Sequence, residues 1–142
     1  MDCQEFHFPI RVYYEDTDAG GLVYNANYLK FLERARTEWL RELGIEQDLW
    51  LAKGIAFVVR HIDIDFCAAA RFNQRLCVSS RICELKRASL KFSQQIKDDS
   101  GRLLVKAVVT IACVQLPEMK PVAFPDVIKG VFTSATHGTV VY

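Results

Sequence analysis

The fold is decided by residues 11–28, which read RVYYEDTDAGGLVYNANY, and by the helical segment that follows them. Before this stretch, residues 6–14 alternate with a period of two, which predicts an opening strand with Pro9 near an edge or bend. Residues 16–21 interrupt the alternation, and their paired glycines can adopt positive φ. We therefore expect a strand that turns sharply at residues 16–21 and leads into a helix.

The helix is predicted by apolar residues that recur at about 100° per residue and so share one face. They are Tyr28, Leu29, Phe31, Leu32, Ala35, Trp39, Leu40 and Leu43. Asn25 or Asn27 can cap the helix start, and Gly44 is the residue typical of a helix end.

Arg36 is the exception on this helix, because its angle places it on the apolar face. A guanidinium in that position needs a carboxylate or several carbonyl groups, since burying an unpaired charge is costly. The candidate carboxylate partners are Asp16, Asp63 and Asp65.

Four further strands are expected after Gly54, at residues 57–66, 76–85, 90–96 and 103–114. The first three alternate in polarity, whereas the last is apolar on both faces, as a central strand is. One helix can cover five strands only if the sheet curls around it. We therefore expect an α+β fold in which a curled antiparallel five-stranded sheet wraps around one long central helix.

A single domain is expected over residues 1–142. Residues 129–142 show no clear period, and we expect a tail that is loosely ordered or docked on a partner. One helix leaves the other face and the edges of the sheet uncovered, which favours a homodimer or homotetramer.

The composition gives no indication of a nucleic-acid or membrane partner. The chain carries 18 basic and 17 acidic side chains, for a net charge of +1, so it has no long-range field for polyanions. We expect no signal peptide and no membrane insertion, because the N-terminus lacks basic and apolar regions and no apolar run is long enough. Five cysteines without C-x-x-C spacing favour reduced thiols in a cytoplasmic protein. No metal and no cofactor are expected.

Residues 11–28, together with FLERARTE at residues 31–38, resemble the hot-dog-fold thioesterases. The similarity is strongest to the hydroxybenzoyl-CoA thioesterase family, in its Tol-Pal-associated (YbgC-like) branch. It extends in element order from residue 6 to residue 116. The resemblance implies an enzyme that hydrolyses an acyl-CoA thioester to a free acid and CoA, with CoA present only as part of the substrate.

The resemblance also implies roles for individual residues. Asp18 would be the nucleophile or the general base, and the backbone N–H of Asn25 at the helix N-terminus would polarise the thioester carbonyl. The basic turn near Lys86 resembles the place where the family binds the nucleotide end of CoA, often from the neighbouring subunit. The expected substrate-binding residues are Gly20, Gly21, Val23, Tyr24, Arg60, Lys86, Arg87 and Ser89.

Asn25 departs from the branch, whose members commonly carry a histidine there. Asparagine can form hydrogen bonds but cannot take a proton near neutral pH, so we expect a changed rate or a different preferred acyl group. The departure keeps open an alternative, a non-catalytic module that binds acyl-CoA or an acyl-carrier-protein thioester. A hot-dog hydratase would need a histidine paired with a carboxylate, and His7 in the opening strand is only a superficial match.

Overall fold

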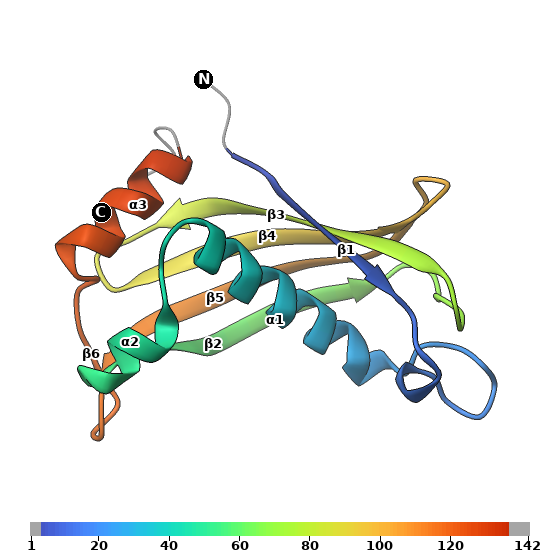
Figure 1. The fold of residues 1–142 in the computed structure, drawn as a ribbon, viewed down its shortest axis with the longest axis horizontal. Helices are drawn as coiled ribbons and strands as arrows, with labels where there is room; N and C mark the ends of the chain where they lie inside the picture. The colour runs from blue at the N-terminus through green and yellow to red at the C-terminus, as the bar shows by residue number, and fades with distance from the viewer. Residues whose placement is uncertain (1–3, 137–142) are drawn as a thin grey trace.

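An antiparallel sheet curls around one long helix in the computed structural model, which describes residues 4–136 (Figure 1). The helix is α1, Asn25–Glu42. The strands are β1 (Phe6–Arg11), β2 (Ile55–Phe66), β3 (Arg75–Leu85), β4 (Ser89–Asp98) and β5 (Leu103–Gln115), in the order β1-β3-β4-β5-β2. A short strand, β6 (Lys120–Pro121), pairs with β5. The predicted α+β architecture is confirmed.

The core lies between the apolar face of α1 and the concave face of the sheet. The helix contributes most of its periodic apolar residues, of which Phe31, Leu32 and Ala35 are almost completely buried, whereas Leu29 is 37% exposed. On β4, alternate side chains such as Leu90 and Phe92 point into the same core. Burying a large apolar side chain contributes about 1.5–3 kcal/mol to the stability of the fold. The apolar residues of the helix and of the strands face each other, so their burial holds the two layers together.

Besides β6, three helical elements add to the predicted set: η1 (Tyr14–Asp16), α2 (Gln47–Ala52) and α3 (Asp126–Thr136). The expectation of a loosely ordered tail was wrong for residues 129–136, because these residues form most of α3. This helix buries Ile128, Phe132 and Ala135, which are spaced as one helical face. Residues 137–142 of the expected tail lie outside the described residues.

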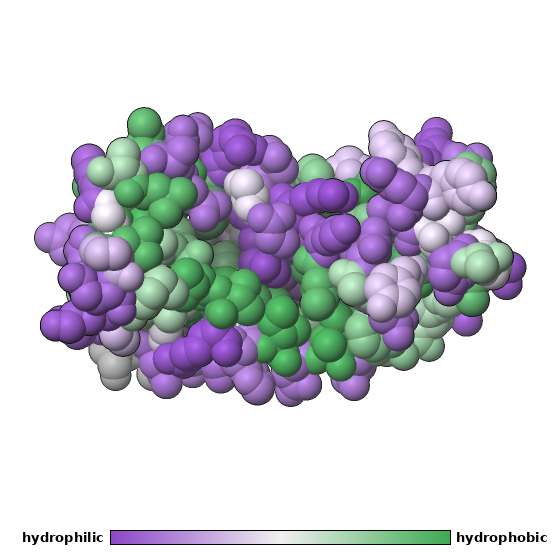
Figure 2. Space-filling view, turned by 90° about the horizontal axis from the view of Figure 1, so that it is seen from below, coloured by the Kyte–Doolittle hydropathy of each residue, from purple (hydrophilic) through white to green (hydrophobic). Residues whose placement is uncertain are grey.

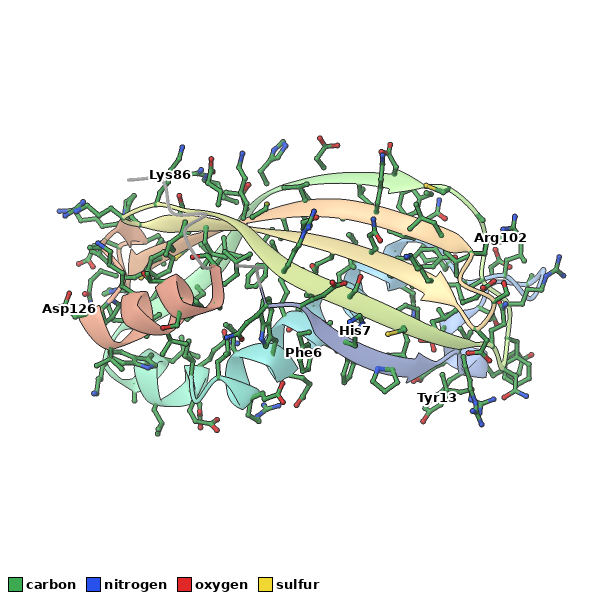
Figure 3. All side chains as sticks on the ribbon, turned by 90° about the horizontal axis from the view of Figure 1, so that it is seen from above. Phe6, His7, Tyr13, Lys86, Arg102 and Asp126 are labelled. Atoms are coloured by element: carbon green, nitrogen blue, oxygen red, sulfur yellow. The ribbon has the colours of Figure 1, made fainter. Side chains whose placement is uncertain are left out.

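The two ends of the molecule differ in what they carry. The connection from β1 to α1 lies at one end, whereas α2 and α3 lie at the other (Figure 1). The view from above gives the same division, with Tyr13 and Arg102 at one end and Lys86 and Asp126 at the opposite end (Figure 3). Helix α1 runs between these ends, so its N-terminus lies beside the loop that contains Asp18.

Cys67, Cys77, Cys83 and Cys113 are free thiols. Cys113 is buried, and burial raises the pKa of its thiol to about 11. None of the helices within residues 4–136 combines the length and the apolar character needed to cross a membrane.

Candidate active site

A hydrogen-bonded hairpin carries Asp18 to the start of α1. Thr17 and Val23 form an isolated antiparallel bridge, and the N–H of Asp18 donates to the carbonyl oxygen of Leu22 at 2.8 Å. The N–H of Gly21 closes the turn by donating to the carbonyl of Asp18 at 3.0 Å. Gly21 has a φ of +78°, a conformation that residues with a Cβ rarely adopt, so this glycine shapes the turn.

The Asp18 carboxylate is held by one of its two oxygens. Its Oδ1 accepts the N–H of Gly20 at 2.9 Å and the N–H of Leu22 at 3.3 Å. Its Oδ2 accepts no hydrogen bond from any residue between 4 and 136, and Asp18 is exposed. One oxygen therefore orients the carboxylate, while the other is available to take a proton or to attack a carbonyl carbon.

Asp16, two residues earlier, is bonded through both oxygens and is only 6% exposed. Its Oδ2 accepts the N–H of Tyr13 at 2.8 Å, and its Oδ1 accepts the side-chain amide of Asn27 at 2.9 Å. Its carbonyl oxygen accepts the N–H of Tyr24 at 3.0 Å. Asp16 thus fixes the loop to the first turn of α1, as a structural residue.

The first turn of α1 presents backbone donors at the same end of the molecule. Tyr24 is the N-cap, and no side chain caps the helix, so the expected capping by Asn25 or Asn27 was wrong. The N–H of Asn25 has no acceptor within the described part of the chain. The first N–H groups of a helix lie at the positive end of its dipole. Asn25 is exposed, so its N–H can meet a ligand.

The remaining predicted substrate-binding residues on this hairpin differ in exposure. Val23 is buried in the core and donates its N–H to Ala70 at 2.9 Å, so its side chain supports the loop from behind. Tyr24 is exposed beside the helix start. A Cβ at Gly20 would lie 3.3 Å from Oδ1 of Asp18, a tight contact that would push on the carboxylate.

The other predicted residues lie away from Asp18 within one chain. Lys86 and Arg87 lie in the turn between β3 and β4, and Ser89 is the first residue of β4. The N–H of Lys86 donates to the carbonyl oxygen of Ser89 at 2.8 Å. This turn is at the far end of the sheet (Figure 3). Arg60 is exposed on β2, where the register with β5 shifts.

Arg36 is buried as predicted, but its partner is not a carboxylate. Its Nη1 donates to Oε1 of Gln94 at 3.0 Å. Gln94 in turn donates from Nε2 to the carbonyl of Leu32 at 3.1 Å and to Oγ of Ser80 at 2.9 Å. The candidate partners fail because Asp16 is bonded within its own loop and both aspartates of β2 are exposed.

The alternation of residues along β4 is a sequence signal for the buried position of Gln94. Gln94 occupies the inward-facing position in the alternation of Leu90, Phe92 and Ile96 on β4. A polar residue on a buried face needs a hydrogen-bond partner, and Arg36 is a polar residue on the buried face of the helix.

Within residues 4–136, no three His, Cys, Asp or Glu side chains gather as a metal site requires.

The chain is similar to known proteins in sequence and in fold. A sequence profile described as the thioesterase-like superfamily matches residues 12–132. The chain is 50% identical over 128 residues to the acyl-CoA thioesterase YbgC of Haemophilus influenzae, an alignment that covers 89% of this chain and 93% of that protein.

Solved structures show the same similarity. A probable thioesterase from Bartonella henselae superposes with a TM-score of 0.80 and 39% identity, covering 86% of this chain and 100% of that chain. A 1,4-dihydroxy-2-naphthoyl-CoA thioesterase from Synechocystis superposes with a TM-score of 0.85 and 27% identity, covering 91% and 96%. The profile match spans both the Asp18 hairpin and the sheet.

Proposed function

We propose that this chain, which belongs to the thioesterase-like superfamily and within it to the YbgC-like thioesterases, hydrolyses an acyl-CoA thioester to a free acid and CoA. One observation carries the proposal: a single hairpin joins a carboxylate with one free oxygen to a helix N-terminus with a free N–H. Thioester hydrolysis needs both groups, a base or nucleophile and a donor for the developing oxyanion.

Asp18 acts in one of two ways. In the first, its carboxylate attacks the thioester carbonyl, CoA leaves as a thiolate that takes up a proton, and water cleaves the resulting mixed anhydride. In the second, the carboxylate takes a proton from a water molecule as that water attacks the carbonyl carbon. The adduct then expels CoA as a thiolate, which takes up the proton. Both routes pass through a tetrahedral intermediate that places a negative charge on the former carbonyl oxygen.

The N–H of Asn25 stabilises that oxyanion. A single donor of this kind is worth about 10²–10³ in kcat, and the helix dipole adds to it in the same direction. The contribution comes from the backbone, so it survives any side chain at this position. The Asn25 side chain can orient a water molecule or the carbonyl but cannot serve as a second base. Asn25 therefore adds no base to the reaction, and Asp18 supplies it.

A second copy of the chain completes the site. Strand β2 is an edge of the sheet, and an unpaired edge favours pairing with another chain. Val59 and Phe66 on this strand are each 46% exposed. Viewed from below, the side on which β2, α1 and α2 lie in Figure 1, hydrophobic residues form a band that crosses the molecule with hydrophilic residues above its middle (Figure 2). Burial of this band favours a dimer, which is either the complete assembly or one half of a tetramer.

Antiparallel pairing of two β2 strands explains the separated binding residues. The turn with Lys86, Arg87 and Ser89 lies at the end opposite the Asp18 hairpin (Figure 3). A twofold axis beside β2 reverses the second copy, and its basic turn then lies toward the Asp18 end of the first. The lysine and arginine there would bind the phosphates of CoA, with Arg60 on the shared edge. The cytoplasmic location expected from the sequence stays a prediction.

The test is hydrolysis of a graded panel of acyl-CoA esters and acyl-carrier-protein thioesters, followed by detection of the released thiol. The purified protein is expected to release CoA from at least one ester, in a dimer or tetramer measured by light scattering. Tight binding of acyl-CoA in calorimetry without hydrolysis over hours would instead favour the non-catalytic binding module. A monomer that hydrolyses the esters at full rate would contradict the two-subunit site.

A further inference from the structure

A second candidate site lies deeper in the molecule, in a cavity of about 90 Å³ between α1, the sheet and α3. Its walls are mostly apolar and include Phe57, Leu90, Ile111 and Phe132. Arg36, which also lines it, lies about three turns beyond Asn25 on α1, roughly 16 Å at 1.5 Å per residue. The cavity is therefore distinct from the Asp18 hairpin of the same chain.

Arg36 brings an unpaired positive charge to this cavity. It is 7% exposed, its one side-chain partner is the neutral Gln94, and no carboxylate among residues 4–136 lies within 4.0 Å of its guanidinium. No fully buried side-chain nitrogen or oxygen in the described part of the chain lacks a partner. The guanidinium N–H groups that do not donate to Gln94 are therefore not fully buried. Because Arg36 lines the cavity, we take these N–H groups to be accessible from it.

The guanidinium remains charged at neutral pH. Burial lowers the pKa of Arg36 to about 10, and the nearby negative charge of Glu33 opposes that shift. Glu33 is exposed and accepts a hydrogen bond from Oγ1 of Thr37 at 3.4 Å, and both residues line the cavity. Glu33 repels an anion at the rim, so an anionic ligand must reach past it to the guanidinium.

We propose that this cavity binds the carboxylate of a short aliphatic acid, with Arg36 as its anchor and the apolar walls around its chain. A guanidinium presents paired N–H donors that match the two oxygens of a carboxylate, and the anion would offset the buried charge. A water molecule needs about 10–15 Å³ of cavity volume, so a cavity of about 90 Å³ holds several groups of that size. We therefore expect room for a carboxylate on a chain of roughly four to six carbons.

Two sources can supply this carboxylate: the free acid released by hydrolysis, or the far carboxylate of a dicarboxylic acyl thioester. The inference rests on the proposed function only for the choice of aliphatic acids as probes. Binding of a free acid is measured without turnover, so its failure is distinguishable from a failure of hydrolysis.

The direct test is calorimetric titration with hexanoate of the wild type and of Arg36→Met, Ile111→Phe and Asp18→Asn. Arg36→Met removes the anchor and Ile111→Phe fills the cavity, and each is expected to weaken binding at least about tenfold. Asp18→Asn, which leaves the cavity intact, is expected to bind within about twofold of the wild type. Hexanol, which keeps the chain and lacks the charge, is expected to bind the wild type at least about tenfold more weakly.

The ligand series on the wild type keeps the test valid even if Arg36→Met does not fold. Equal binding of hexanoate and hexanol, or no binding of hexanoate at all, overturns the proposal. So does undiminished binding of hexanoate to a folded Arg36→Met variant.

The source of the carboxylate is resolved by comparing kcat/KM for adipoyl-CoA and hexanoyl-CoA. If the far carboxylate of the substrate occupies the cavity, Arg36→Met lowers the ratio of the two values at least about tenfold. If the free acid occupies it, the ratio is unchanged and inhibition by hexanoate weakens at least about tenfold. A variant that changes neither quantity overturns the assignment of Arg36.

Discussion

Asp16 and Asp18 stand two residues apart in one loop and have opposite surroundings. Asp16 is buried and accepts hydrogen bonds through both oxygens, which join Tyr13 to Asn27. Asp18 is exposed and, among the described residues 4–136, accepts hydrogen bonds through Oδ1 alone. The Asp16 carboxylate therefore has a structural role, whereas Oδ2 of Asp18 is available for the reaction.

The difference shows how a reactive carboxylate can be both oriented and available. The loop is stabilised through Asp16 and the turn at Gly21, so Asp18 needs only one oxygen to hold its position. Changes at Asp16, or in the core at the far end, are therefore expected to affect folding. A change at Asp18 is expected to affect turnover.

The core beneath α3 gives the largest expected loss of stability. Ile128→Ala removes a completely buried side chain and is expected to lower the free energy of unfolding by about 3–4 kcal/mol. Val127→Ala, at a neighbouring position that is 72% exposed, is the control and is expected to change it by less than about 0.5 kcal/mol. Chemical denaturation measures both. An Ile128→Ala variant as stable as the wild type would contradict the docking of α3.

Asp16→Ala is expected to lower the free energy of unfolding by about 2–3 kcal/mol, because two donors lose a charged acceptor. Glu15→Ala, at the exposed neighbouring position, is the matched control and is expected to be nearly neutral. Denaturation and amide exchange of Tyr13 measure the effect. If the two variants were equally stable, the contrast drawn between Asp16 and Asp18 would fail.

Replacing a glycine by alanine is expected to change the free energy of unfolding in opposite directions in the Asp18 hairpin and in α3. Gly21→Ala forces a Cβ onto a φ of +78° and is expected to cost about 1–2 kcal/mol. Gly130→Ala lies in α3, where a Cβ meets nothing within 4 Å, and is expected to stabilise by about 0.5–1 kcal/mol. Thermal unfolding of both variants checks the signs. Destabilisation by Gly130→Ala would contradict the helical assignment of this segment.

Asn25→His gives the smallest expected effect, an increase in kcat of about two- to tenfold. The backbone N–H is kept, and the new imidazole adds a base whose ordinary pKa is about 6.5. The gain should therefore be absent at low pH and appear as the pH rises through that value. A pH–rate profile of both proteins measures it. An identical profile would mean that the side chain at position 25 does not contact the reacting groups.

Much of the fold could be predicted from the sequence because it depends on local periods. The helix at Asn25–Glu42 and the long strands follow directly from apolar spacing. Helix α3 was missed because Gly130 and the β-branched Thr133 and Thr136 weaken its local helical preference. Its burial against the core decides the outcome, and that contact is not visible in a single segment.

The candidate site was less accessible to prediction, because it depends on hydrogen bonds between distant residues. The Asp18 loop could be selected by its resemblance to a family. The free oxygen of Asp18 and the full use of Asp16 needed coordinates. Gln94 lies 58 residues from Arg36, and the packing of α1 against β4 brings the two together.

Asp18→Asn is the most direct measurement of the central claim, because the asparagine keeps the Oδ1 acceptor for Gly20 and Leu22. The amide cannot take a proton or attack a carbonyl at neutral pH. With an acyl-CoA that the wild type hydrolyses, kcat is expected to fall by about 10²–10⁴. The free energy of unfolding is expected to change by less than about 0.5 kcal/mol. A folded Asp18→Asn enzyme with kcat within about threefold of the wild type would contradict the assignment of the reaction to this carboxylate.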